Sequence, residues 1–366
     1  MMNKLKVNLD RKQVNSYDIH IGEDILDRSV LIMARNNWAK RYFVVADGHV
    51  AALHGGLLCD TMKRADLKVD MIDFPAGEKA KTLSTCLEIA ERLADLGADR
   101  TSAVVALGGG VTGDIAGLTA SLYMRGIPCI HFPTTLLAQI DSCIGGKTGV
   151  DTDAGKNLIG TFHQPKAVFI DIAFLRTLPD REFRNGLAEM AKYALIESPE
   201  LAAQMEANVE KLRNRDLSFL EGVIASCCRI KKGIVEIDEK ETGLRRILNF
   251  GHTVGHALEA ESDYAISHGD AVSVGMAAAT KISQRLNYLS GEDAERIIAF
   301  IRNMGLVERM APNVRTDAIL ARLKMDKKKQ GENIHFVLLK KMGMPFVNGG
   351  VPVPIVRETI EGLKHV

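Results

Sequence analysis

The first half of the chain alternates short apolar runs with amphipathic segments. Arg41–Asp47, Lys68–Phe74 and Ser102–Leu107 are apolar runs of strand length, as expected for strands buried in a parallel sheet. Thr82–Gly97 has helical apolar spacing and ends at a glycine. Two earlier runs, Leu5–Leu9 and Tyr17–Gly22, are predicted as further strands. This order predicts a Rossmann-like α/β domain.

Helical periodicity dominates after about residue 179, with Glu182–Ala194 as its first clear example. We therefore predict two domains, an α/β domain over 1–178 and an all-α domain over 179–366. Ile334–Leu339 is the exception and is predicted as a late strand or hairpin arm.

Composition narrows the class of protein. The 366 residues are 46% hydrophobic and 25% charged, which is ordinary for a globular protein, and the net charge of +1 gives no reason to expect nucleic acid or a membrane as partner. The N-terminus lacks the apolar core of a signal peptide, and no apolar run reaches the length of a membrane span. Six scattered cysteines without a C-x-x-C pair favour the cytoplasm.

A glycine-rich turn predicts a nucleotide site. Gly108, Gly110 and Gly113 satisfy G-x-G-x-x-G between a strand and a helix, where backbone amides can approach a pyrophosphate. The acid expected about 20 residues downstream is missing, since His131–Leu136 occupies that place. Asp47, at the end of an earlier strand, is the candidate acceptor for ribose hydroxyls, and a helix-capping role is the alternative. The fold is therefore a variant of the usual dinucleotide scheme.

A second glycine-rich stretch follows at 145–157. Gly145–Thr148 resembles the end of a phosphate loop, but the preceding glycine is missing, which excludes a P-loop NTPase. Lys147, Lys156 and Asn157, with many exposed backbone amides, nevertheless suit a phosphorylated small molecule. The alternative is a loop with solvated lysines.

Histidines in the second half indicate a metal site. His252 and His256 are four residues apart and share a helix face, and His268 follows after a short polar break. A carboxylate would complete such a site. Glu189 and Lys192 share a face of an apolar helix, where buried charges either pair with each other or bind a metal.

Several motifs now occur in one order along the chain. They are Gly-Gly-Gly-Val-x-Gly-Asp at 108–114, Pro-Thr-Thr-Leu-Leu-Ala at 133–138, Asp-Ser-x-Ile-Gly-Gly-Lys-Thr at 141–148, Gly-Lys-Asn at 155–157, Glu-x-x-Lys at 189–192, Asn-Phe-Gly-His-Thr-x-Gly-His-Ala at 249–257 and His-Gly at 268–269. Together they resemble the 3-dehydroquinate synthase family over nearly the whole chain. That resemblance implies an N-terminal α/β NAD-binding domain, a helical C-terminal domain and an active site between them.

The resemblance also implies roles for individual residues. The metal ligands would be Glu189, His252 and His268, binding zinc with cobalt as a possible substitute, while His256 would face the substrate. The NAD contacts would be Asp47, Ala76, Gly77, Glu78, Lys79, Ala80, Lys81, Gly110, Val111, Thr112, Gly113, Asp114, Thr134, Thr135, Lys147, Lys156, Phe174, Leu175, Arg176 and Thr177. The substrate contacts would be Asp141, Lys147, Asn157, Lys192, Lys231, Arg245, Asn249 and His256, with Lys328 and with Arg125 lent across a homodimer.

The activity implied by the family is a redox-neutral cyclisation. It converts 3-deoxy-D-arabino-heptulosonate 7-phosphate, a sugar-phosphate carboxylate, into 3-dehydroquinate and phosphate by transient oxidation, β-elimination, re-reduction and aldol closure. Two alternatives stay open: a cyclase resembling 2-deoxy-scyllo-inosose synthase, and a metal-dependent dehydrogenase resembling glycerol dehydrogenase. Lys231 and Arg245 suit a carboxylate and disfavour the first, whereas the lysine-rich 145–157 segment disfavours the second.

Overall fold

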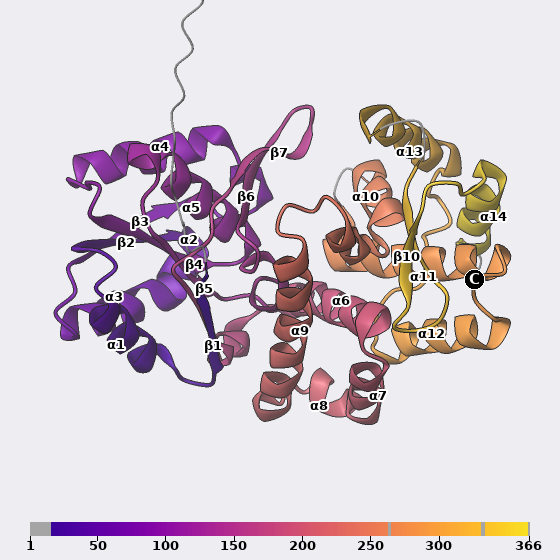
Figure 1. Ribbon diagram of the computed structural model, residues 1–366, viewed down its shortest axis with the longest axis horizontal. Coiled ribbons are helices and arrows are strands. Elements are labelled where there is room, and N and C mark those ends of the chain that lie inside the picture. Colours follow the sequence, from indigo (N-terminus) through magenta and orange to yellow (C-terminus); the bar gives the residue numbers. More distant parts are fainter. Residues whose placement is uncertain (1–15, 263–264, 331–333, 365–366) are drawn as a thin grey trace, which may run out of the picture.

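A six-stranded parallel sheet forms the first half of the molecule, shown in indigo and purple in Figure 1. The computed structural model describes residues 16–262, 265–330 and 334–364, so the predicted strand Leu5–Leu9 lies outside the described residues. The strands run in the order β1 (Asp18–Gly22), β8 (Ala167–Asp171), β5 (Cys129–Pro133), β4 (Ser102–Gly108), β2 (Arg41–Asp47) and β3 (Val69–Phe74). The strands predicted from the sequence after residue 16 are thus confirmed.

Helices cover both faces of this sheet. α1 (Leu26–Asn36) and α3 (Gly56–Arg64) pack on one face, and α4 (Leu83–Asp95) and α5 (Gly110–Leu122) pack on the other (Figure 1). Successive residues of β2 feed the two cores in turn, with Val44 in the first and Val45 in the second. A strand buried on both faces has to be apolar throughout, which explains the continuous apolar run in the sequence.

The strand order reverses between β2 and β4. From β2 the chain moves outward to β3, and then returns to place β4 on the other side of β2. Ligands of open α/β sheets bind at the carboxyl ends of the strands at such a point. Asp47 ends β2 and Gly108 ends β4, so both candidate nucleotide residues lie there.

The glycine-rich stretch after residue 145 is a hairpin, whereas the sequence predicted a loop with exposed amides. β6 (Lys147–Thr152) pairs antiparallel with β7 (Gly155–Phe162), and α5 packs against β6. A Cβ atom on Gly160 would lie 2.1 Å from the Thr148 carbonyl oxygen, so the close pairing of the strands requires glycine there. The backbone of this stretch therefore takes part in strand pairing. Side chains of the hairpin, and not its paired amides, would contact a bound molecule.

The second half is mostly helical. Its helices are α6 (Asp180–Glu197), α7 (Pro199–Ala207), α8 (Val209–Arg213), α9 (Leu217–Ile237), α10 (His252–Glu261), α11 (His268–Arg285), α12 (Gly291–Asn303), α13 (Thr316–Gln330) and α14 (Val353–Leu363). An antiparallel pair, β9 (Phe336–Leu339) and β10 (Pro345–Asn348), confirms the predicted late hairpin, so this half is not purely helical. None of the described helices is long and apolar enough to cross a membrane.

One apolar cluster joins the helices to the sheet. Val168 and Ile170 of β8 belong to the same buried cluster as Ala191 of α6 and Ile224 of α9. The sheet and the helices therefore meet through a packed interface at β8, and Figure 1 shows α6 and α9 on the side of the sheet that faces the helical half. The division into domains at residue 178 stays a prediction.

Candidate active site

Three side chains from three helices form a cluster of possible metal ligands. The Nε2 atoms of His252 and His268 each lie 3.5 Å from Oε1 of Glu189. Ligands arranged tetrahedrally around a zinc ion at about 2.0–2.1 Å are separated by about 3.3–3.4 Å. Both oxygens of Glu189 are buried without a hydrogen bond of normal geometry, although the Lys192 ammonium approaches Oε2. A buried carboxylate facing two imidazole nitrogens fits a three-ligand divalent-metal site with an open position.

Small residues bring the two histidines together. His252 begins α10 and His268 begins α11, and these helices cross in close contact. Gly251 has φ +82°, and a Cβ atom there would lie 2.7 Å from the Val272 carbonyl oxygen. Asn185 of α6 accepts a hydrogen bond of 2.9 Å from the Gly269 amide, which places Glu189, one turn along α6, against the start of α11.

The second nitrogen of each histidine ring has its own partner. Nδ1 of His252 lies 3.2 Å from the Phe250 carbonyl oxygen, and Nδ1 of His268 lies 3.4 Å from Glu259 Oε2. These contacts leave both Nε2 atoms directed at the cluster. Burial alone would lower the pKa of His268, but the neighbouring carboxylates of Glu189 and Glu259 raise it to about 10. Burial lowers the pKa of His252 to about 3.

A row of lysine–carboxylate pairs extends from the cluster. Lys192 pairs with Glu189 on α6, and both side chains are buried. Lys231 of α9 pairs with Asp141, which also accepts a hydrogen bond of 2.9 Å from Tyr193. Burial would raise the pKa of Asp141, but the charges of Lys231 and Lys192 hold it well below its usual range. The sequence-predicted residues 141, 192 and 231 therefore lie together.

Glu241 joins two further predicted residues. Its carboxylate pairs with Lys147 and accepts a hydrogen bond of 3.0 Å from the Asn249 side chain. Nearby, the Arg245 guanidinium donates to the Glu239 carbonyl oxygen. A Cβ atom on Gly145 would lie 2.5 Å from a nitrogen of the same guanidinium. Sequence reasoning missed Glu241 because it stands in an acidic and basic run typical of a solvated loop.

The nucleotide side of the site surrounds the turn after β4. Asp47 caps the short helix α2 (Gly48–Val50) through hydrogen bonds from two backbone amides, and Thr112 donates to its other oxygen at 3.3 Å. Asp47 therefore has the capping role and also faces the glycine-rich turn. The Thr134 amide donates to the Gly108 carbonyl oxygen at 2.9 Å, which brings the 133–138 motif to the same place.

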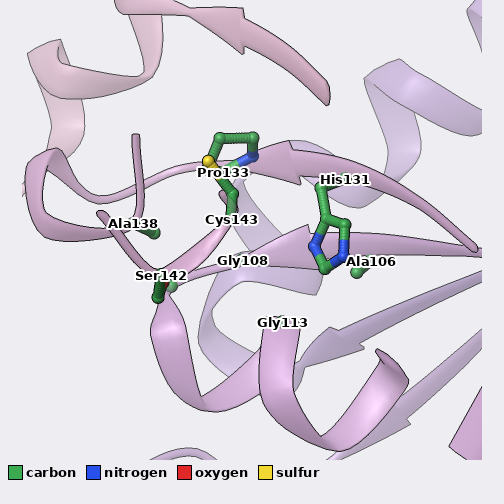
Figure 2. A pocket seen from close by; sticks show the side chains of 9 residues that line it. Ala106, Gly108, Gly113, His131, Pro133, Ala138, Ser142 and Cys143 are labelled. Carbon is green, nitrogen blue, oxygen red and sulfur yellow. The ribbon is translucent and has the colours of Figure 1, made fainter. Parts of the chain in front are cut away.

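Figure 2 shows a small cavity beneath this turn, at the carboxyl ends of β4 and β5. Gly108, Gly109 and Gly113 line it together with His131 and Cys143. A Cβ atom on Gly108 would lie within 2.9 Å of three Thr112 atoms, so glycine is needed for the helix to approach the strand. Burial lowers the pKa of His131 to about 4, which leaves a neutral ring beside the turn.

Within the predicted segment 76–81, Lys81 contacts the glycine-rich turn. The Lys81 ammonium lies 2.6 Å from both the Asp114 carboxylate and the Asn157 side-chain oxygen. Lys156 lies 3.4 Å from Glu78. Ala76, Gly77, Glu78 and Lys79 are exposed.

Other predicted residues lie apart from these contacts. Phe174 and Leu175 are buried in the apolar cores, and Arg176 pairs with Glu23 and Asp24. Arg125 is exposed, and none of the ion pairs within the described part of the chain involves it. The side chain of Lys328 lies outside the described residues.

Comparison with known proteins now decides the family. Family models described as 3-dehydroquinate synthase N-terminal and C-terminal match residues 71–185 and 186–329. The chain belongs to the 3-dehydroquinate synthase family. A curated 3-dehydroquinate synthase of Desulforamulus reducens is 41% identical over 343 residues, covering 93% of this chain and 95% of that protein.

Solved structures of sugar-phosphate cyclases share the fold of this synthase-family chain. A 2-deoxy-scyllo-inosose synthase complexed with carbaglucose-6-phosphate, NAD⁺ and Co²⁺ is 30% identical, with a TM-score of 0.85 over 94% of this chain and 96% of its own. A 2-epi-5-epi-valiolone synthase from Streptomyces hygroscopicus with NAD⁺ and Zn²⁺ bound is 29% identical, with a TM-score of 0.89 over 98% and 99%. The predicted Rossmann-like first half is thereby confirmed, and the second half, predicted as all-α, is mostly helical.

Proposed function

We propose that this chain catalyses the 3-dehydroquinate synthase reaction, with NAD as a recycled oxidant and zinc or cobalt as the metal. The observation that carries the proposal is the cluster of buried Glu189 with half-buried His252 and His268, beside a row of lysines. The cluster and the lysines coincide with the motifs of a family that this chain matches over nearly its full length.

The metal would be held by the three-ligand cluster. When bound, it would supply Lewis-acid polarisation of a substrate hydroxyl. Lys192 lies against Glu189 and contributes a buried positive charge that favours an anionic substrate at the same place. His256 is exposed next to His268, with ring centroids 6.2 Å apart, and would face the substrate beside the cluster of Glu189, His252 and His268.

NAD would bind at the switch point of the sheet. Asp47 would accept from ribose hydroxyls, and the N-terminus of α5 would receive the pyrophosphate. The remaining NAD contacts implied by the resemblance, including Lys156 and Thr134, stand as part of this proposal. Phe174 and Leu175 would contribute through backbone atoms, because their side chains are buried in the core.

The phosphate and carboxylate groups of the substrate would take over the lysines that now pair with Glu241 and Asp141. Lys147 pairs with Glu241 and Lys231 pairs with Asp141. In each pair a carboxylate stands where a substrate anion could bind the lysine. We assign the phosphate to Lys147, Asn157 and Arg125, and the carboxylate to Lys231 and Arg245. Holding both ends of the substrate orients it for elimination and ring closure.

A homodimer forms part of the proposal. Leu158, Ile159 and Phe162 are exposed on β7, and the Thr161 hydroxyl donates to Ser121 at 2.8 Å, next to exposed Leu122. Exposed apolar side chains beside a sheet edge are typical of an interface. Arg125 follows this surface, so a partner could place it in the neighbouring site.

A cytoplasmic location is also proposed. All six cysteines are free and buried within the fold. Reduced thiols of this kind are typical of proteins in a reducing compartment.

A substrate panel tests the proposed reaction. Purified enzyme with NAD and zinc receives 3-deoxy-D-arabino-heptulosonate 7-phosphate, glucose 6-phosphate or glycerol, and phosphate and NADH are followed in parallel. The proposal expects phosphate from the first substrate alone without net NADH. Phosphate from glucose 6-phosphate alone would identify an inosose-type cyclase, an alternative favoured by the structural likeness but not by the retained Lys231 and Arg245. Net NADH from glycerol would identify a dehydrogenase.

A further inference from the structure

Glu259 lies between the metal cluster and the nucleotide side of the molecule. It lies on α10 two helical turns after His252, and its side chain is 5% exposed. Its Oε2 atom lies 3.4 Å from Nδ1 of His268, and its Oε1 atom lies 3.7 Å from the ammonium of Lys156. Each carboxylate oxygen therefore faces a different cation or donor.

Lys156 continues these contacts into the first half of the chain. It belongs to β7, and its ammonium lies 3.4 Å from Glu78 in the segment that follows β3. Contacts thus run from Glu78 through Lys156 and Glu259 to His268. They connect a predicted nucleotide-binding segment with a predicted metal ligand through side chains alone.

We propose that Glu259 is a positioning residue for the metal centre and that Lys156 holds Glu259 in this role. A carboxylate that accepts from Nδ1–H of a ligating histidine fixes the tautomer and orientation of the ring and increases the basicity of Nε2. Lys156 approaches the other oxygen of the same carboxylate and so helps to fix its orientation. A residue of the hairpin therefore contributes to metal affinity without touching the metal. This inference rests on the metal-binding part of the proposed function.

Glu259 could alternatively ligate a second metal ion with His256 and His268, since ligand atoms of these three residues also lie within 4.8 Å of one another. Two observations oppose that role. The Lys156 ammonium already neutralises one oxygen of Glu259, and the other oxygen faces the Nδ1 atom that His268 would need for ligation. The structure therefore favours one metal ion and a supporting carboxylate.

The test measures zinc affinity by competition with a chelator, so that its readout does not depend on turnover. Glu259→Gln is expected to bind one zinc ion about 10–100-fold more weakly than the parent enzyme. Lys156→Met is expected to weaken zinc by a smaller factor. The Glu259→Gln/Lys156→Met double variant should match Glu259→Gln, because a residue that acts through Glu259 has no effect once Glu259 is neutral.

Glu261→Gln is the matched control, because Glu261 lies on the same helix but pairs with Arg315 at 2.9 Å. It should keep the zinc affinity of the parent enzyme. The visible spectrum of the Co²⁺-loaded protein gives a second readout, and its bands should shift in Glu259→Gln but not in Glu261→Gln. Thermal unfolding of both variants shows whether a change in folding accompanies any loss of zinc.

The outcomes separate this inference from the proposed function. Unchanged zinc affinity and an unchanged Co²⁺ spectrum in Glu259→Gln would overturn the positioning role, and so would two zinc ions per chain. Additive losses in the double variant would overturn the role of Lys156. If the parent enzyme bound no zinc, or if His252→Ala bound it equally well, the metal site of the proposed function would itself be wrong.

Discussion

The Lys81 ammonium lies 2.6 Å from the Asp114 carboxylate, and the two side chains are only 7% and 18% exposed. The pair joins the segment after β3 to the N-terminal part of α5, directly at the glycine-rich turn. Removing one member of a buried pair leaves an uncompensated charge. We therefore expect the proposed nucleotide site to depend on this ion pair for its shape.

Replacing Lys81 should destabilise the fold. We expect Lys81→Met to lower the free energy of unfolding by about 3 kcal/mol, because Asp114 is left buried without its cation. Chemical denaturation measures the loss. Lys63→Met, which removes an exposed pair with Asp60, should change stability by less than about 1 kcal/mol. Equal effects of the two substitutions would contradict the importance of burial at Lys81.

The two histidines of α10 should respond differently to substitution. His252→Ala should lose stoichiometric zinc and at least about a thousandfold of turnover, because it removes a ligand. His256→Ala should keep its zinc while losing activity, because this side chain is proposed to face the substrate. Zinc content after gel filtration distinguishes the two variants. A His252→Ala protein with one zinc per chain would refute the ligand assignment.

Activity should decrease at alkaline pH because of Lys147. Burial and the neighbouring charges of Arg245 and Lys231 lower its pKa to about 8. The ammonium is present below that pH and is lost as the pH rises, so kcat/KM for the phosphorylated substrate should fall through about pH 8. Lys147→Arg keeps its charge and should move the decline to higher pH. A decline at the same pH in both proteins would assign it to another group.

Lys231 should affect substrate binding more than metal binding. Lys231→Ala should raise KM about 10–100-fold, since a hydrogen bond to a charged group is worth about 1.5–3 kcal/mol. Its zinc content should stay at the parent level, because Lys231 pairs with Asp141 and not with a ligand. Steady-state kinetics and metal analysis are made on the same preparation. A collapse of zinc content would show that the carboxylate role is wrong.

Arg125 should act across the dimer. Arg125→Ala and Lys192→Met are each expected to be inactive alone. Mixing the two variants under conditions that let subunits exchange between dimers should restore about one quarter of parental activity. Half of the dimers would then be mixed, and one of the two sites in each would be intact. Phosphate release from the mixture measures this recovery. A mixture as inactive as its components would place Arg125 in the site of its own chain.

Much of the fold could be predicted from local patterns. The runs that became β2 and β4 are apolar because both faces of each strand are buried, and the turn at Gly108 combines a strand end with a helix start. Such features are set by residues that are close together in the sequence, so the sequence alone can predict them. The hairpin of β6 and β7 was missed because its glycines and lysines resemble a loop, and only the contact with α5 shows its packing.

The site itself was less predictable. Spacing places His252 and His256 on one helix face, but the choice of ligand depends on how α10 crosses α11, which Gly251 helps to determine. Glu241 and Glu259 gain their positions from partners far along the chain or in another element. No local pattern distinguishes such a glutamate from a solvated one, and tertiary contacts alone reveal it.

The most direct test of the central claim counts turnovers per NAD. Enzyme is loaded with one equivalent of NAD and zinc, freed of excess cofactor, and given 3-deoxy-D-arabino-heptulosonate 7-phosphate. We predict many phosphate ions released per NAD, with NADH absorbance returning to its starting value. Release that stops at one phosphate per NAD, with NADH remaining, would contradict a recycled oxidant.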